Sequence, residues 1–322
     1  MSLTQPPLVP ASRAQPSPAH GAHAGTPRNR KVRRLSGRDR VTVALFVAIP
    51  TLVVVGLIWL PAIASVLLSF TNWNGVGSLS DIKIIGLQNY TDVFTIYPPF
   101  KPALENNVLW LAVTFLLATP LGMFFAVLID KELKGSRFYQ TAIYLPVVLS
   151  LALIGFIWQL QYSRDQGFIN GVLGTQIDFF GDQDWNIWAA LVASSWRHVG
   201  YVMLLYLAGL KGVDASLKEA AQMDGANQVQ TFFRVVFPVM RPINIIVLVI
   251  TVIESLRAFD LVWIINRGTN GLELLSALVT QNIVGEASRI GFGSALATIM
   301  LLISLVFISI YLWVVMREDN QR

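Results

Sequence analysis

Six long apolar stretches constrain this chain more than any other feature of its sequence. Each has about 20 residues or more, which is the length an α-helix needs to cross the hydrocarbon core of a bilayer. Inside lipid every backbone polar group has to be satisfied within the protein, and a helix does this by itself. We therefore expect an all-α, polytopic membrane protein with six transmembrane helices, at about 41–70, 108–129, 141–160, 185–210, 243–265 and 290–315.

The composition excludes the main alternatives to a membrane protein. Hydrophobic residues make up 54% of the 322 residues, charged residues only 13%, and cysteine is absent. Soluble globular domains carry about 25% charged residues, and disordered chains are poor in hydrophobic residues. A soluble enzyme, a disordered chain and a disulfide-built secreted module are therefore all excluded.

The first 40 residues differ from the rest of the chain. Prolines are frequent there, and a basic segment follows just before the first apolar stretch. That stretch is too long for a signal peptide, whose apolar core has about 7–15 residues. We expect residues 1–40 to form a disordered, basic cytoplasmic tail, residues 41–316 the transmembrane domain, and residues 317–322 a short cytoplasmic tail.

The distribution of lysine and arginine predicts the orientation of the helices. With the N-terminus inside, the cytoplasmic segments hold 17 of these residues and the outer loops hold five. Cytoplasmic loops of membrane proteins carry such an excess of positive charge. Both termini are therefore predicted to be cytoplasmic.

Several kinds of catalytic and cofactor site are missing from the sequence. The chain has no Gly-Lys dipeptide, so it cannot form the phosphate-binding loop GxxxxGK[ST] of many ATPases. Only three histidines occur, two of them in the tail, and no metal site or cofactor is expected. A Ser-His-Asp hydrolase would have to be built around His198, so an enzyme is a minor alternative.

The inner loop at 211–241 carries the most informative motif. It predicts a short helix from Asp214 to Met223, a stop at Gly225, and a second helix from about 227 to 236 that ends before Pro238. An amphipathic helix pair lying on the lipid surface is one interpretation of this pattern.

The string Glu-Ala-Ala-Gln-Met-Asp-Gly-Ala at 219–226 resembles the EAA loop of binding-protein-dependent ABC importer permeases, and more narrowly that of the maltose-type carbohydrate permeases. Further matching segments lie at 69–73, 85–90, 144–146, 167–170 and 207–210. The resemblance implies that the transmembrane domain is a permease domain and that the loop forms coupling helices docked on a cytoplasmic ATPase. The coupling residues it implies are Glu219, Ala220, Ala221, Asp224 and Gly225.

Ionisable residues inside two predicted spans form a second candidate site. Each costs at least about 2.5–3.5 kcal/mol at mid-membrane, so these groups are expected to face a cavity or each other. Their spacing of three in the fifth span predicts one stripe on a single helix. A structural ion network is one interpretation. The other is a substrate path, which the resemblance supports, with the candidate residues Ser194, Arg197, His198, Tyr201, Glu254, Ser255, Arg257 and Asp260.

The resemblance implies a permease subunit that imports a sugar, an oligosaccharide or glycoside, across a prokaryotic plasma membrane. Its implied partners are a second homologous permease, two ATPase subunits and an extracytoplasmic sugar-binding protein. No nucleic-acid partner is expected. Two alternatives are a permease of the same type for another polar solute, and a secondary transporter coupled to ions through Glu254 and Asp260.

Overall fold

The computed structural model describes residues 36–131, 134–285 and 288–319. Within these ranges all regular structure is helical, apart from one isolated bridge between Thr71 and Ile84, which confirms the all-α prediction. Most of the expected N-terminal tail, and residues 320–322 of the C-terminal one, lie outside the described residues. The first helix begins at Gly37, slightly before the predicted boundary.

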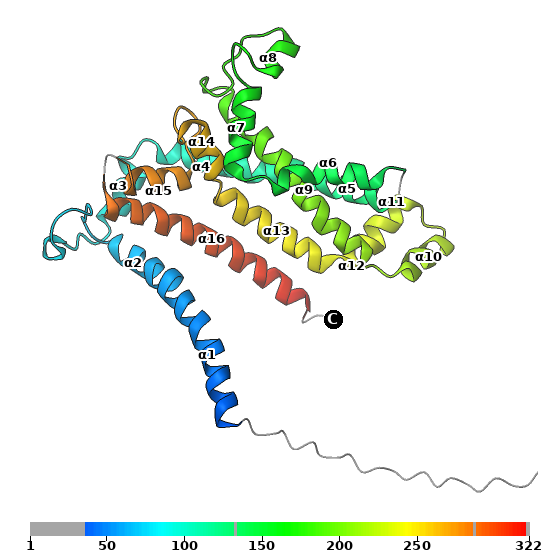
Figure 1. Ribbon diagram of the computed structural model, residues 1–322, viewed down its shortest axis with the longest axis horizontal. Helices are drawn as coiled ribbons and strands as arrows, with labels where there is room; N and C mark the ends of the chain where they lie inside the picture. Colours follow the sequence, from blue (N-terminus) through cyan, green and yellow to red (C-terminus); the bar gives the residue numbers. More distant parts are fainter. Residues whose placement is uncertain (1–35, 132–133, 286–287, 320–322) are drawn as a thin grey trace, which may run out of the picture. The chain divides into compact units, whose positions relative to one another are not determined.

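Contacts between residues divide the chain into two units, with the boundary after Val55. In the first unit, α1 (Gly37–Val54) begins where the Ser36 amide donates to Asp39 Oδ2 at 3.1 Å, and all its residues are exposed. The second unit runs from Gly56 and holds the remaining helices (Figure 1). They are α2 (Leu60–Leu68), α3 (Gln88–Thr95), α4 (Phe100–Val113), α5 (Thr119–Asp130), α6 (Ser136–Val148), α7 (Leu151–Gln161), α8 (Phe168–Leu173), α9 (Asn186–Lys211), α10 (Ala215–Met223), α11 (Gln228–Thr231), α12 (Phe237–Val239), α13 (Arg241–Leu256), α14 (Asp260–Asn266), α15 (Leu275–Ile283) and α16 (Ile290–Asp319).

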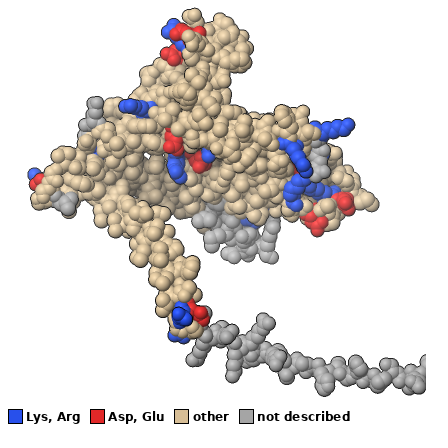
Figure 2. All heavy atoms as spheres, viewed as in Figure 1, with Lys and Arg blue, Asp and Glu red and all other residues tan. Residues whose placement is uncertain are grey.

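Three helical segments of the described chain have the length and composition to cross a membrane: Gly37–Leu68, Phe100–Asp130 and Ile290–Ile310. The number rises to five if two bent helix pairs each count as one span. Helix α9 has 26 residues but is not among them. Figure 2 shows that charged side chains are sparse on the face in view, as a surface in contact with lipid requires. The count of six spans stays a prediction.

The third predicted span is bent. Helices α6 and α7 meet at 104°, where an uninterrupted helix over 141–160 was expected. Leu149 has extended backbone angles, and the hydroxyl of Ser150 accepts the amide of Leu153 at 3.2 Å. The second helix therefore has its own N-cap at Ser150. Helices α6 and α7 are thus two separate helices and not one helix with a kink.

The fifth predicted span is interrupted as well. Helix α13 ends at Leu256, and α14 begins only at Asp260. The prediction that Glu254, Arg257 and Asp260 share a stripe on one helix is therefore wrong. The physical reason is that the residues between the two helices leave the helical backbone, so the regular spacing of three no longer fixes their direction.

Helix α9 lies at the centre of the packing in the second unit. Its residues Val202, Met203 and Tyr206 are buried in one cluster with Ala126 and Ile129 of α5. Two glycines allow the backbones to approach closely. A Cβ on Gly122 of α5 would lie 2.8 Å from the carbonyl oxygen of Val199, and a Cβ on Gly200 of α9 would lie 2.3 Å from that of Ile143 in α6.

The second span contains a π-helical turn, Thr114–Ala118, between α4 and α5. The backbone amide of Thr119 donates to the carbonyl of Thr114, five residues earlier. Such turns are rare and often lie at functional sites. This one faces the membrane cluster described below.

We predict that Gly200→Ala lowers the stability of the folded protein by about 1–3 kcal/mol, because the new methyl group would meet backbone that cannot move independently. The measurement is thermal unfolding of the purified chain in detergent. Gly171→Ala is the matched control, since a Cβ there meets nothing within 4 Å. Equal melting of the two variants would contradict the close contact of α9 with α6.

Candidate functional site

The eight candidate substrate residues form the membrane cluster: Ser194, Arg197, His198, Tyr201, Glu254, Ser255, Arg257 and Asp260. Two of its ionisable residues are in direct contact. Arg197 Nη1 of α9 lies 3.5 Å from Glu254 Oε2 of α13. Their side chains are 28% and 44% exposed, so the pair lies at a surface or cavity and is not sealed in the core. Arg197 Nε is buried and has no hydrogen-bond partner among the described residues. The ion pair joins the two helices, as the structural interpretation of these charges requires.

A small cavity brings together most of the predicted substrate residues. Of the eight, Tyr201 and Arg257 do not line it. Its volume is about 40 Å³, far too small for a sugar ring. A substrate therefore requires this region to open or to be completed by another surface. The predicted residues that line the cavity are Ser194, Arg197, His198, Glu254, Ser255 and Asp260.

This cavity borders a network of buried hydroxyl groups, of which Thr114 and Ser255 belong to its lining. His198 Nε2 lies 3.3 Å from Thr119 Oγ1 and 3.2 Å from Thr251 Oγ1. Ser255 Oγ lies 2.7 Å from Thr114 Oγ1 and donates to the carbonyl of Thr251 at 2.7 Å. The hydrogen-bonding capacity of His198 and Ser255 is thus partly used within the protein. No described carboxylate contacts the imidazole, so a Ser-His-Asp arrangement has no support here.

The threonines were missed in the sequence, and so was the aromatic wall. Trp110 of α4 and Phe259 line the same cavity, and Phe259 stacks on Trp263 with ring centroids 5.2 Å apart. Isolated threonines in an apolar run bond back to their own helix and give little signal. The only signal for this network in the sequence was that the second, fourth and fifth spans each carry polar residues.

The inner loop has the predicted helix, stop and helix. The side chain of Asp214 accepts the amide of Ser216 at 2.9 Å, and this hydrogen bond lowers the pKa of the Asp214 carboxyl below its usual value. Gly225 has a φ of 81°, the left-handed conformation that favours glycine. The second helix begins at the cap Asn227 and stays helical through Val239, so the expected end before Pro238 is wrong.

One of the five implied coupling residues in the inner loop is buried rather than exposed. Of the implied coupling residues, Glu219, Ala220, Asp224 and Gly225 are exposed, whereas Ala221 is buried with only 8% of its surface accessible. Ala221 therefore packs within the chain and does not belong to a surface for a partner. Met223 is 88% exposed and supplies apolar surface on the outside of the loop.

The C-terminal end of α5 holds the inner loop in place. Asp130 Oδ2 lies 3.4 Å from Lys218 Nζ of α10, and Asp130 Oδ1 lies 3.5 Å from Lys211 Nζ at the end of α9. The next residue, Lys131, donates to Gln228 Oε1 of α11 at 3.0 Å. Both short helices of the loop are thus linked to one membrane helix by polar contacts.

The chain belongs to the family described as the binding-protein-dependent transport system inner membrane component, which matches residues 118–319. It is therefore a membrane component of an ABC-type, binding-protein-dependent transport system, which confirms the family inferred from the EAA loop.

Two relatives and one solved structure show how far the similarity extends. The probable ABC transporter permease protein YurN of Bacillus subtilis (strain 168) is 29% identical, over 83% of this chain and 94% of its own length. The arabinooligosaccharides transport system permease protein AraP of Halalkalibacterium halodurans is 32% identical, over 70% of this chain and 74% of its own. A chain of a bacterial ABC transporter involved in the import of the acidic polysaccharide alginate has the same fold, with a TM-score of 0.75 at 19% identity, covering 87% of this chain and 96% of that one.

We predict that Asp130→Asn loosens the inner loop. Ion pairs that stay accessible to solvent are worth about 1 kcal/mol, and this pair is partly exposed, so amide hydrogen exchange in α10 should become about fivefold faster. Exchange in α15, which makes no contact with Asp130, serves as the internal reference. Adding Lys218→Met to Asp130→Asn should cause little further change, because the contact is already lost. Unchanged exchange in the single variant would show that Asp130 does not hold α10.

Proposed function

We propose that this chain is the translocation subunit of an ATP-driven importer that carries a sugar, an oligosaccharide or glycoside, delivered by an external binding protein. The observation that carries the proposal is the family match over residues 118–319. The names of the relatives support the substrate class, since AraP is described as transporting arabinooligosaccharides and the structural neighbour as importing alginate.

The partners follow from what the chain lacks. It has no phosphate-binding loop, so ATP hydrolysis belongs to a separate subunit, present in two copies below the membrane. The cavity of about 40 Å³ is too small for the solute, so a second homologous permease would complete the path. We place the complex in a prokaryotic plasma membrane, with both termini of this chain in the cytoplasm and the binding protein outside.

The inner loop would couple the ATPase to the path. Helix α10 presents Glu219 and Ala220 outward, and its C-cap Asp224 is exposed as well, so all three are free to contact the ATPase. Gly225 permits the reversal into α11. Movement of the docked loop would reach the membrane through Asp130. Rigid-body rocking of packed helices is an established way to convert such a movement into opening and closing of a site.

The membrane cluster would bind the solute when the path opens. Arg197 and Glu254 are close enough to neutralise each other, and both remain partly exposed. Sugar hydroxyls donate and accept hydrogen bonds, so they are able to bridge such a pair without leaving either charge unpaired. The aromatic ring of Phe259 offers a flat apolar surface to a sugar ring.

The energy source tests the proposal. We predict that proteoliposomes containing this chain, a homologous permease, the ATPase and the binding protein take up a labelled oligosaccharide only when the ATPase has ATP. A panel of maltotriose, arabinotriose and glycine betaine separates a sugar from another polar solute. Uptake by this chain alone, driven by a proton or sodium gradient, would instead establish a secondary transporter.

We predict that Glu254→Gln leaves the protein abundant and raises the KM for sugar uptake by roughly fivefold, since a hydrogen bond to a charged group is worth about 1.5–3 kcal/mol and one to a neutral amide about 0.5–1.5 kcal/mol. Glu105→Gln is the control, because Glu105 forms only an exposed pair with Lys101 at 3.8 Å. Loss of protein that is restored by a neutral residue at Arg197 would favour a purely structural pair. Unchanged uptake kinetics in a well-expressed complex would remove Glu254 from the substrate site.

A further inference from the structure

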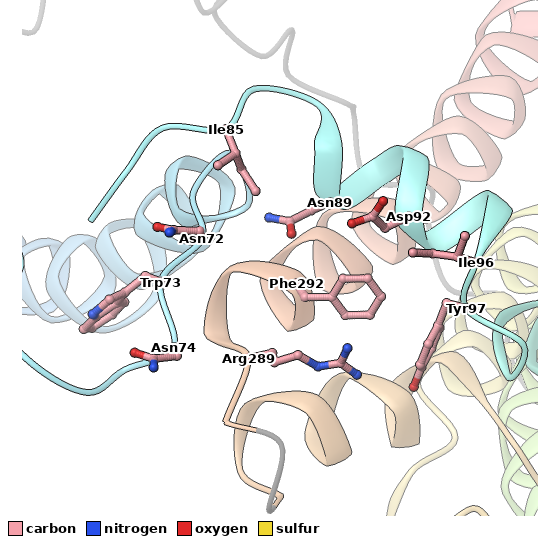
Figure 3. A pocket seen from close by; sticks show the side chains of 10 residues that line it. All are labelled: Asn72, Trp73, Asn74, Ile85, Asn89, Asp92, Ile96, Tyr97, Arg289 and Phe292. Atoms are coloured by element: carbon pink, nitrogen blue, oxygen red, sulfur yellow. The ribbon is translucent and has the colours of Figure 1, made fainter. Parts of the chain in front are cut away.

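A second cavity lies between α3 and the start of α16 and shares no lining residue with the cavity of the membrane cluster. Figure 1 shows these two helical segments at one end of the second unit. Its volume is about 250 Å³. The wall consists of the loop after α2, helix α3 with the residues that follow it, and the first residues of α16 (Figure 3). Helices α10 and α11 lie at the opposite end of this unit, so the cavity would open to the outside in the proposed orientation.

One side of the cavity is a preorganised aromatic and cationic surface. The guanidinium of Arg289 lies 4.7 Å from the centre of the Phe292 ring and 5.9 Å from that of Tyr97. Asn282, only 3% exposed, holds this arrangement, since its amide donates to the Tyr97 hydroxyl at 2.9 Å and accepts from Arg289 at 2.7 Å. No described carboxylate forms an ion pair with Arg289. Its remaining N–H groups have no acceptor among the described residues and would donate into the cavity.

Two asparagines on the opposite wall also have unused donors. Asn72 Oδ1 accepts the amide of Lys83 at 3.0 Å, and Asn74 Oδ1 accepts the amide of Val76 at 3.0 Å. Their side-chain NH₂ groups make no hydrogen bond to any described residue. Because the carbonyl ends are fixed, these NH₂ groups have a defined direction.

The acceptors come from α3. Asn89 is buried and donates its NH₂ group to the carbonyls of Ser69 and Thr71, at 2.8 Å each, which leaves its own carbonyl oxygen unused. The carboxylate of Asp92 makes no hydrogen bond or ion pair within the described chain. Figure 3 shows Asn89 and Asp92 side by side on the α3 wall, across from Arg289.

We propose that this cavity binds one pyranose or furanose unit of a neutral oligosaccharide, as an outer subsite separate from the membrane cluster. The inference rests on the proposed function. Each sugar hydroxyl both donates and accepts, and the cavity offers free donors and free acceptors around aromatic rings. Its volume suits one sugar unit, with the rest of the chain outside. Asp92 balances the charge of Arg289, which favours a neutral sugar over a uronate.

The absence of cysteine from the sequence makes a direct test possible. Ile96 lines the cavity and is 70% exposed, while the neighbouring Thr95 is exposed and does not line it. The complete transporter without its binding protein is prepared with Ile96→Cys or Thr95→Cys and labelled with a maleimide dye. Maltotriose and arabinotriose, tested separately, should slow labelling of Ile96→Cys about tenfold at about ten times the dissociation constant. Labelling of Thr95→Cys should not change.

Further variants separate binding from folding. Asp92→Asn and Arg289→Gln should abolish protection of Ile96→Cys, while an unchanged thermal unfolding midpoint of each variant complex shows that the fold is retained. An alginate trisaccharide should protect less than a neutral sugar. Uptake is measured with the same complexes after the binding protein and ATP are added. If a sugar is imported but does not protect Ile96→Cys from labelling, this subsite alone is overturned. The subsite alone is also overturned if the sugar-free binding protein protects Ile96→Cys and sugar does not. Absence of sugar import overturns the proposed function and the subsite with it.

Discussion

Close backbone contact of α9 with α5 and α6 is the interaction on which the rest of the structure depends. In lipid, burial of apolar side chains gives little driving force between helices, because the surrounding chains are equally apolar. Association then relies on small residues and on hydrogen bonds. Gly122 and Gly200 provide the small residues, since a Cβ at either position would collide with a neighbouring helix. This contact fixes α9 and with it the position of Arg197, which meets Glu254 of α13.

Polar contacts in the second unit add to that packing in two places, one within the spans and one beside the inner loop. Within the span region, Thr114, Thr119 and Thr251 give His198 and Ser255 partners that lipid cannot offer. At the end near the inner loop, Asp130 joins three elements through two lysines. The first set orders the candidate path and the second orders the loop, and α5 and α9 contribute residues to both.

The sequence predicted best what local physical chemistry decides. Apolar length predicted helices, and the capping residue Asp214 and the glycine at 225 predicted α10 and its end, because both signals act within one turn. The breaks at Ser150 and after Leu256 were not predicted, since the same apolar residues suit one long helix or two short ones. The inward position of Ala221 could not be derived either, because small residues suit both sides of a helix. The clustering of Asn89, Asp92 and Arg289 depends on contacts between segments about 200 residues apart, which no local pattern records.

The π-helical turn at 114–118 adds one residue to the second span and thereby aligns the hydroxyl groups at its two ends. It contains one residue more than an α-helix would use, and so it brings Thr114 and Thr119, five apart, to the same hydroxyl network. An α-helix turns by about 100° for each residue. In an uninterrupted α-helix two residues five apart would therefore differ by about 140° in direction. Removal of a single residue from this turn would leave an ordinary α-helical turn, in which the two threonine hydroxyls would no longer be held five residues apart in one network. The extra residue thus sets the arrangement of hydroxyl groups along the candidate path, whatever its side chain.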